Sequence, residues 1–285
     1  MQRSIQETLL HDAVRLTDVL AINPSSARIE IQCLLQQVLN VPRAWLLAHS
    51  EHYPNETEQM HYQELLQRRL RGEPVAYLLG EREFFGLMFT VTPATLIPRP
   101  ETELLVELAL ARIPQQDLCR VLDLGTGSGA IALALAHARP DVEVLGCDAS
   151  TTALAVAHAN AQQLGVANAA FIHSDWFEAF TTQKFNIIVS NPPYIAAGDP
   201  HLTRGDVRFE PISALVSGSD GLHDIRHIAA HAPDHLEPGG WLLLEHGYNQ
   251  AAQVRELLQQ AGGFDVVFSA CDLAGIERIS GGRIA

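Results

Sequence analysis

Four consecutive residues, Asn191-Pro192-Pro193-Tyr194, have the types and the order expected of a site that acts on a planar amino group. They follow the stretch 185–190, Phe-Asn-Ile-Ile-Val-Ser, whose apolar and β-branched residues predict a buried strand. Each proline has a fixed φ and biases the residue before it away from helix. We therefore expect residues 191–194 to form a stiff, extended ledge at the carboxyl end of a strand, where open α/β sheets bind their ligands.

The chemistry that suits this ledge is transfer of a group to an amide or aromatic –NH2. Such a nitrogen is a poor nucleophile because its lone pair is delocalised, so a site must hold both N–H bonds and aim the nitrogen at the electrophile. The side-chain oxygen of Asn191 and the main-chain carbonyl of Pro192 can accept those two bonds, and Tyr194 can stack on the flat group. Holding the reacting atoms in line is mainly a proximity effect. Read alone, the same four residues also fit a plain strand-ending turn.

A glycine-rich segment, Val121-Leu122-Asp123-Leu124-Gly125-Thr126-Gly127-Ser128-Gly129, predicts a nucleotide-binding loop between a strand and a helix. Glycine permits positive φ and close approach of a ligand to the backbone, and a helix start offers free N–H groups. The spacing is G-x-G-x-G, whereas a dinucleotide fingerprint is G-x-G-x-x-G, and position 130 is alanine. The pattern disfavours a pyrophosphate ligand, although variants with alanine at the last position exist. The candidate cofactor-binding residues here are Gly125, Thr126, Gly127, Ser128 and Gly129.

Acidic residues follow the next two predicted strands. Asp148 lies about 20 residues past the glycines, where a carboxylate can accept hydrogen bonds from ribose hydroxyls. Asp175 and Trp176 follow the third strand, where an adenine would lie; Asp175 can accept from its amino group and Trp176 can stack on its ring. Each residue alone also fits an ordinary role: a helix N-cap, a turn and the core. Together with the glycine loop and the ledge they place four motifs at four successive strand ends, which indicates one cofactor site.

The apolar pattern divides the chain into a helical part and an α/β part. Residues 1–78 predict a bundle of four helices that serves as a substrate-docking domain, with a capping box at Ser4 and Glu7 and with Met60 facing inward. Residues 79–100 predict a linker with a β-hairpin. In residues 101–285 helices alternate with strands, which predicts a parallel, doubly wound sheet. The predicted strands are 120–124, 142–147, 169–173, 185–190 and 240–245, with two more at 265–269 and 276–280.

The composition limits the classes of partner. The formal net charge is −14 over 285 residues and Lys184 is the only lysine, so the chain offers no bulk basic footprint for nucleic acid. No apolar run approaches the ~18 residues of a membrane helix, and residues 1–7 lack the apolar core of a signal peptide. The four cysteines are far apart and form no C-x-x-C. We expect a cytoplasmic protein with reduced cysteines, no membrane contact and no direct nucleic-acid partner.

Taken together, these motifs resemble class I S-adenosylmethionine-dependent methyltransferases that act on amino groups. Asn-Pro-Pro-Tyr is shared with DNA adenine and rRNA guanine methyltransferases, so it does not identify the acceptor. With three further segments, nearly the whole chain is similar to the release-factor glutamine methyltransferases, the PrmC/HemK family. Those segments are Gly72-Glu73-Pro74-Val75-Ala76-Tyr77-Leu78-Leu79-Gly80, Ile97-Pro98-Arg99-Pro100-Glu101-Thr102-Glu103 and Arg208-Phe209-Glu210-Pro211.

The resemblance implies an α/β fold: a Rossmann-like class I methyltransferase sheet with a small all-α N-terminal domain and a β-hairpin linker. It implies methyl transfer from S-adenosylmethionine to the side-chain amide nitrogen (N5) of the glutamine in the Gly-Gly-Gln motif of class 1 peptide chain release factors, in translation termination. By position, the glycine loop, Asp148 and Trp176 would bind the cofactor, and residues 98–102 would close over the site. Asn191 and Pro192 would hold the glutamine amide beside Tyr194. No residue is an obvious general base.

Three other functions remain open. A nucleic-acid amino-methyltransferase, acting on adenine N6 or guanine N2, would use the same ledge and would show a basic patch beside the cleft. A nucleotide-binding regulator would bind the cofactor tightly and turn over no acceptor. A dinucleotide oxidoreductase is disfavoured by the glycine spacing and by the lack of an evident hydride-transfer partner.

Histidines recur every four residues in the helix predicted at 222–236. A helical projection places them on the solvent face, opposite the apolar face. The segment also lacks H-E-x-x-H, so we expect no functional metal. The histidines are His223, His227, His231 and His235.

Overall fold

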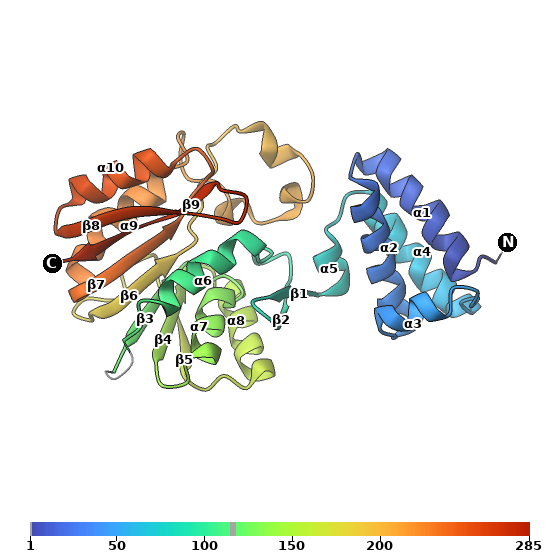
Figure 1. Ribbon diagram of the computed structural model, residues 1–285, viewed down its shortest axis with the longest axis horizontal. Helices are drawn as coiled ribbons and strands as arrows, with labels where there is room; N and C mark the ends of the chain where they lie inside the picture. The colour runs from blue at the N-terminus through green and yellow to red at the C-terminus, as the bar shows by residue number, and fades with distance from the viewer. Residues whose placement is uncertain (1, 115–117) are drawn as a thin grey trace. The chain divides into compact units, whose positions relative to one another are not determined.

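The computed structural model describes residues 2–114 and 118–285, and its chain divides into two compact units. The first unit comprises the residues up to Glu81 together with His201–Phe209, and the second comprises Arg82–Pro200 and Glu210–Ala285 (Figure 1). A segment that lies within the sequence of the second unit thus packs as part of the first. The apolar pattern of the sequence contains no sign of this exchange.

The first unit is a helical bundle that contains the four predicted helices and a fifth, short one. The capping box is confirmed: the Ser4 hydroxyl accepts the Glu7 N–H at 3.3 Å, and the Glu7 carboxylate accepts the Ser4 N–H at 2.8 Å. The fifth helix was not predicted because five residues are too few to show a helical apolar pattern. The helices are α1 (Ile5–Leu20), α2 (Pro24–Leu39), α3 (Arg43–Ala48), α4 (Glu56–Leu70) and α5 (Val75–Leu79).

The buried face of α4 differs from the predicted one. Met60 was expected to face inward and is 67% exposed, so that prediction is wrong. The residues that α4 buries include Tyr62, Leu65, Leu66 and Arg69. An arginine is buried only where its charge is paired. The apolar pattern does not show which charges pair, so it could not place Arg69 on the buried face.

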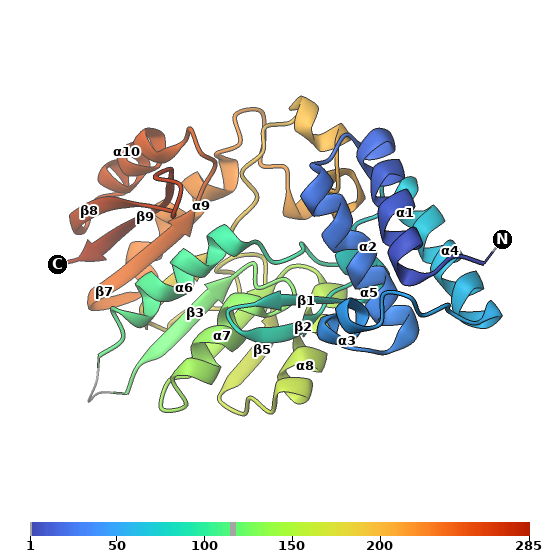
Figure 2. The ribbon, with the colours of Figure 1, turned by 45° about the vertical axis from the view of Figure 1, so that its right-hand side comes forward.

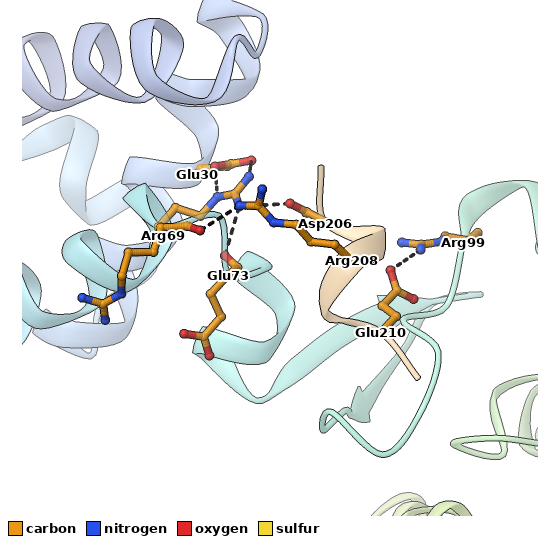
Figure 3. A network of polar contacts seen from close by, with 8 residues as sticks. Glu30, Arg69, Glu73, Arg99, Asp206, Arg208 and Glu210 are labelled. Carbon is orange, nitrogen blue, oxygen red and sulfur yellow. Dashed lines mark hydrogen bonds and ion pairs between the residues drawn. The ribbon is translucent and has the colours of Figure 1, made fainter. Parts of the chain in front are cut away.

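Arg69 is the centre of an ion-pair network inside the first unit (Figure 3). The Arg69 side chain is only 3% exposed, and its guanidinium contacts the Glu30 carboxylate at 2.7 Å and the Asp206 carboxylate at 3.0 Å. It also donates to the main-chain carbonyl of Glu73 at 3.0 Å. Nearby, the Arg208 guanidinium donates to the Arg71 carbonyl at 2.8 Å. These contacts hold the segment His201–Phe209 on the bundle.

Replacing Asp206 by alanine is expected to loosen this segment. Asp206 is 40% exposed, so water screens the ion pair and its loss costs only about 1 kcal/mol. Opening of the segment should then rise roughly fivefold, with faster tryptic cleavage after Arg204 and Arg208. Asp220→Ala, which removes an exposed carboxylate paired with Arg226 in the second unit, is the matched control. Equal cleavage rates in the two variants and the wild type would contradict this role of Asp206.

The second unit is built on a seven-stranded sheet in the order β5-β4-β3-β6-β7-β9-β8. The five strands from β5 to β7 pair in parallel, as predicted. The strands are β3 (Arg120–Leu124), β4 (Glu143–Asp148), β5 (Ala169–His173), β6 (Phe185–Ser190), β7 (Leu236–Glu245), β8 (Phe264–Cys271) and β9 (Glu277–Ile284). The helices are α6 (Glu103–Leu110), α7 (Ala130–Ala138), α8 (Thr151–Leu164), α9 (His223–His235) and α10 (Ala251–Ala261).

The sheet is not wholly parallel, which corrects the prediction for its last two strands. β9 pairs antiparallel with both β7 and β8. Only five residues, 272–276, join β8 to β9, and a connection that short permits a hairpin but no crossover. The Asp272 carboxylate closes this turn by accepting the N–H groups of Ala274 and Ile276.

Helices cover both faces of the sheet (Figures 1 and 2). Successive strand residues alternate between two cores: Val121 packs with α6, α7 and α8, whereas Leu122 packs with α9 and α10. The predicted hairpin is present as β1 (Glu81–Phe84) and β2 (Leu87–Thr90). The buried Asn160 of α8 bonds to the Thr90 main chain and to the Ser128 carbonyl, and so ties β2 to the glycine loop.

Candidate active site

A cavity of about 390 Å³ opens at the carboxyl ends of β3, β4, β5 and β6, entirely within the second unit. The volume falls in the range of small-molecule sites, roughly 300–1,000 Å³. Most of the predicted site residues line it: Gly125, Thr126, Gly127, Ser128, Asp148, Asp175, Trp176, Asn191 and Pro193. Gly129, Pro192 and Tyr194 are not among the lining residues. Parallel strands bring these distant segments together because their carboxyl ends share one edge of the sheet.

The glycine loop has the backbone that its sequence predicts. Gly125, Gly127 and Gly129 have φ of 71°, 57° and 81°, a region that favours glycine. A Cβ on Gly129 would approach Leu133, Ala157 and Phe171 within 3.2 Å, so this glycine serves packing of the helix start. A Cβ on Gly127 would meet nothing within 4 Å, which leaves the backbone there open to a ligand.

Asp123 anchors the loop from beneath. One carboxylate oxygen accepts the Thr126 hydroxyl at 2.6 Å and the Ala132 N–H at 3.2 Å. The other oxygen is buried and has no hydrogen-bond partner among the described residues. Burial raises the pKa of this carboxyl to about 7, although the hydrogen bonds from Thr126 and Ala132 lower it.

This buried carboxyl predicts a stability that falls as pH rises. Between the unfolded pKa of about 4 and the folded pKa of about 7, the folded state keeps a proton that the unfolded state releases, so stability is lost across that window. Asp123→Asn removes the titration. From pH 5 to pH 8 the variant should lose less stability than the wild type, by on the order of 3 kcal/mol. Denaturant unfolding at pH 5 and pH 8 measures the free energy of unfolding of both proteins. Equal losses of this free energy in Asp123→Asn and the wild type would refute the prediction.

Asp148, Asp175 and Trp176 form the wall next to the glycine loop. The Asp148 carboxylate accepts the N–H groups of Gly127 at 2.9 Å and Ser150 at 2.8 Å, so it fixes the loop and still has lone pairs for a ligand. Burial raises its pKa. Asp175 is exposed, and Trp176 is half-buried with φ of 46°, an uncommon value for a bulky residue. The Trp176 ring lies 3.4 Å from where a Gly125 Cβ would be.

The ledge leaves β6 as predicted. Asn191 lies at the cavity wall, and its Nδ2 donates to the Thr102 hydroxyl at 3.2 Å. Tyr194 is turned away from the cavity lining: its ring packs against the core under α9, and its hydroxyl donates to Glu245 Oε1 at 3.3 Å. The side-chain amide of Gln250 donates to the main-chain carbonyl of Tyr194 at 3.0 Å.

Two segments that carry the family resemblance meet beside the cavity. The Glu210 carboxylate is buried, pairs with the Arg99 guanidinium (Figure 3) and accepts the Ile97 N–H at 3.2 Å. Pro98, Thr102 and Pro211 line the cavity on either side of this contact. The ion pair therefore holds the loop before α6 beside the cavity.

Two buried residues of this site were not expected to bond to the ledge: Glu245 was not selected from the sequence, and Thr102 was expected only within residues 98–102, which would close over the site. Thr102 and Glu245 are both buried and bond to ledge residues. The signal for Glu245 was present, because it follows Trp241-Leu242-Leu243-Leu244 at a strand end, as Asp148 does at its own strand. No sequence signal indicated that Thr102 would bond to Asn191, since only the tertiary structure brings the start of α6 beside β6.

The charges at the cavity select between ligands. Among the described lining residues, three carboxylates (Asp148, Asp175 and Asp224) contribute charge and no basic side chain does. Such a lining repels a pyrophosphate and attracts a cation. S-adenosylmethionine, with a positively charged sulfur, a ribose for Asp148 and an adenine for Trp176, fits this set of side chains.

Comparison with known proteins identifies the family. Residues 15–80 match the PrmC N-terminal domain and residues 101–205 match the methyltransferase small domain. The chain is 50% identical over 276 residues to the release factor glutamine methyltransferase of Salmonella typhimurium, covering 96% of this chain and 97% of that one. It is 52% identical over 270 residues to that of Bordetella pertussis, covering 94% and 99%. The chain belongs to the release factor glutamine methyltransferase family. It is an S-adenosylmethionine-dependent methyltransferase.

Solved structures agree with the family's fold. The T. thermophilus 16S rRNA N2 methyltransferase, in complex with AdoMet and guanosine, has a TM-score of 0.52 at 22% identity and covers 72% of this chain and 50% of its own. The hMettl16 catalytic domain has a TM-score of 0.56 at 18% identity, covering 77% and 81%. At these identities the likeness shows the Rossmann-like methyltransferase fold alone.

Two features of the described residues bear on other classes of protein. No helix within residues 2–114 and 118–285 is long and apolar enough to cross a membrane. Within the same residues no group of three or more His, Cys, Asp or Glu side chains could hold a metal ion. On α9, His223, His227 and His231 are exposed, whereas His235 stacks on Phe177 with ring centroids 4.5 Å apart.

Proposed function

We propose that this enzyme methylates the side-chain amide nitrogen (N5) of the glutamine in the Gly-Gly-Gln motif of class 1 peptide chain release factors. The observation that carries the proposal is Asn191, which lies at the wall of an acidic cavity at the carboxyl end of β6. A side-chain amide there can be held by two acceptors, the Asn191 oxygen and the Pro192 carbonyl. Membership of the family supports the choice of acceptor.

The residues of the cavity divide the work of binding and orientation. The glycine loop admits the cofactor to the backbone, Asp148 accepts the ribose hydroxyls, and Asp175 and Trp176 hold the adenine. When bound, S-adenosylmethionine supplies a methyl group on a cationic sulfur. Asn191 and Pro192 aim the amide nitrogen at that methyl group, with Pro193 keeping the ledge rigid and Tyr194 packing behind it. Such positioning is worth several powers of ten in rate.

The proton leaves the amide nitrogen after the new N–C bond forms. Among the described lining residues no basic side chain faces Asn191. Methylation makes the nitrogen cationic and strongly acidic, so water can take the proton. The site therefore needs orientation more than a general base.

The helical first unit is proposed as the docking domain for the release factor. Its residues 15–80 match a domain named for this family, and α1 carries exposed apolar side chains. Leu10 and Val14 are 58% and 60% exposed and lie one helical turn apart. Adjacent exposed apolar residues of this kind are common in protein contacts.

Methyl-labelled S-adenosylmethionine tests the acceptor directly. The enzyme is offered, in parallel, a class 1 release factor, its Gly-Gly-Ala variant, total rRNA and unmethylated DNA. Label on the release factor that is absent from the Gly-Gly-Ala variant is the expected result. Label on nucleic acid alone would overturn the proposed acceptor and would favour an adenine or guanine amino-methyltransferase. No label on any acceptor despite tight cofactor binding would favour a regulator.

A further inference from the structure

Gln250, the residue immediately before α10, has a buried side chain whose hydrogen bonds join three segments of the second unit. Its Nε2 donates to the Tyr194 carbonyl at 3.0 Å and to the Gly221 carbonyl at 3.2 Å. Its Oε1 accepts the Gly247 N–H at 2.7 Å. The side-chain amide thus connects the ledge, the segment before α9 and the segment after β7.

These three partners fix the orientation of the Gln250 amide. Two of them are carbonyl oxygens, which can only accept, and the third is an N–H group, which can only donate. A side chain must therefore offer two N–H bonds to one side and an acceptor to the other. A carboxylate of the same size would place an oxygen against two oxygens, so the contacts require glutamine in particular.

Gly221 allows the ledge to approach this amide closely. A Cβ at position 221 would overlap the Tyr194 carbonyl oxygen and would lie 2.9 Å from Gln250 Nε2. The φ of 75° at this position also favours glycine. Any side chain at position 221 would therefore push the ledge away from Gln250.

The ledge needs an anchor at each end because its two prolines have no N–H group to donate. Ser190, the last residue of β6, is the first anchor, and its hydroxyl donates to the Leu124 carbonyl at 2.7 Å. Tyr194 is the second anchor, because its carbonyl accepts from Gln250. Between two fixed ends, and with the φ of both prolines fixed, the Pro192 carbonyl has little freedom to turn.

We propose that Gln250 is a positioning residue for methyl transfer: by holding the Tyr194 carbonyl it fixes the ledge so that the Asn191 oxygen and the Pro192 carbonyl face the acceptor nitrogen. The proposal rests on the function proposed above, in which these two acceptors hold an –NH2 group. Gln250 and Gly221 are not among the described residues that line the cavity, so both act through the ledge. Their replacement should slow methyl transfer and leave cofactor binding unchanged.

Replacing Gln250 by methionine keeps the size of the side chain and removes its three bonds. We expect kcat to fall about 10- to 100-fold, while the cofactor Kd and the KM for the acceptor stay within about threefold of the wild type. Gln253→Met, the same exchange at an exposed position of α10, is the matched control. A wild-type kcat in Gln250→Met, or a loss that appears only in Kd or KM, would overturn the proposal.

Gln250→Glu separates the bond to the ledge from the bond to Gly247. Its carboxylate still accepts the Gly247 N–H, but when ionised it has no proton for the Tyr194 carbonyl. Its kcat relative to the wild type should be low at pH 9 and should recover in part toward pH 6, where a protonated carboxyl can donate one bond. Taking the ratio at each pH cancels the titration of the neighbouring Glu245 and His246, which both proteins contain. A wild-type rate at pH 9 would assign the role to the Gly247 contact and contradict the proposal.

Gly221→Ala tests the same contact from the other side. The added methyl group should displace the Tyr194 carbonyl and lower kcat about 10- to 100-fold. Gly239→Ala is the matched control, because Gly239 has a φ of 77° and a Cβ there would meet nothing within 4 Å. The two variants share the backbone strain and differ in the contact with the ledge. Equal kcat values in them would refute the proposal, even if Gln250→Met does not fold.

The labelling assay keeps this test independent of the proposed acceptor. If the wild type labels nucleic acid in place of the release factor, the acceptor is wrong, and the same variants are assayed on that nucleic acid. An exocyclic amino group needs the ledge in the same position. A wild-type kcat in both Gln250→Met and Gly221→Ala on the acceptor actually used would then overturn the role of Gln250 by itself.

Discussion

Replacing Asn191 by alanine is expected to reduce kcat by about 10²–10³-fold or more, while the cofactor Kd changes only a few-fold. The side chain lies at the cavity wall, and in the proposed mechanism its oxygen holds the acceptor nitrogen in line. Its loss leaves the acceptor free to rotate, and a misaligned amide lone pair does not react. Single-turnover rates with labelled cofactor measure the first quantity, and titration calorimetry measures the second.

A conservative variant sharpens this experiment. Asn191→Gln keeps the amide and lengthens the side chain by one methylene, so it should bind cofactor normally and remain slow. Thermal unfolding checks that both variants fold, because Asn191 also bonds to Thr102. Turnover at the wild-type rate in the alanine variant would exclude the ledge mechanism.

Replacing Asp148 by alanine is expected to weaken cofactor binding by about 1–3 kcal/mol, roughly 5- to 150-fold in Kd. The carboxylate lines the cavity and accepts from Gly127 and Ser150. In the proposed mechanism its further lone pairs accept the ribose hydroxyls. Its loss therefore removes ligand bonds and also loosens the glycine loop. Calorimetry with S-adenosylmethionine measures the change.

Two variants separate these contributions. Asp148→Asn keeps one oxygen as an acceptor, so its loss of affinity should be smaller than that of the alanine variant. Asp141→Ala removes an exposed acid, paired with Arg139, before the other end of β4 and should leave the Kd unchanged. Equal Kd values for Asp148→Ala and the wild type would refute the ribose role.

The acidic lining explains why this site favours a cationic cofactor, although glycine-rich helix starts in many other α/β proteins bind phosphate. A helix start preceded by glycines binds phosphate in many α/β proteins, and here the same backbone stands among Asp148, Asp175 and Asp224. The carboxylates repel phosphate and favour a cationic cofactor. The glycine spacing already disfavoured a dinucleotide, and the structure supplies the electrostatic reason.

The sequence alone determined most of the elements and the place where the candidate site residues gather. β3, β5 and β6 begin and end at the residues predicted, because each is a short apolar run between polar or glycine residues. Nine of the twelve predicted site residues line one cavity, since all were chosen at strand ends that a parallel sheet must bring together. Local pattern and topology were sufficient for both results.

Only the tertiary structure decided which polar groups are buried together. The segment His201–Phe209 belongs to the first unit and forms an ion pair with Arg69, a residue that periodicity assigns to no core. The contact of Asn191 with Thr102 and the contact of Tyr194 with Glu245 each join segments that are far apart in the chain. Buried polar contacts of this kind depend on the geometry of single atoms across distant elements, whereas sequence periodicity reports only which face of an element is apolar.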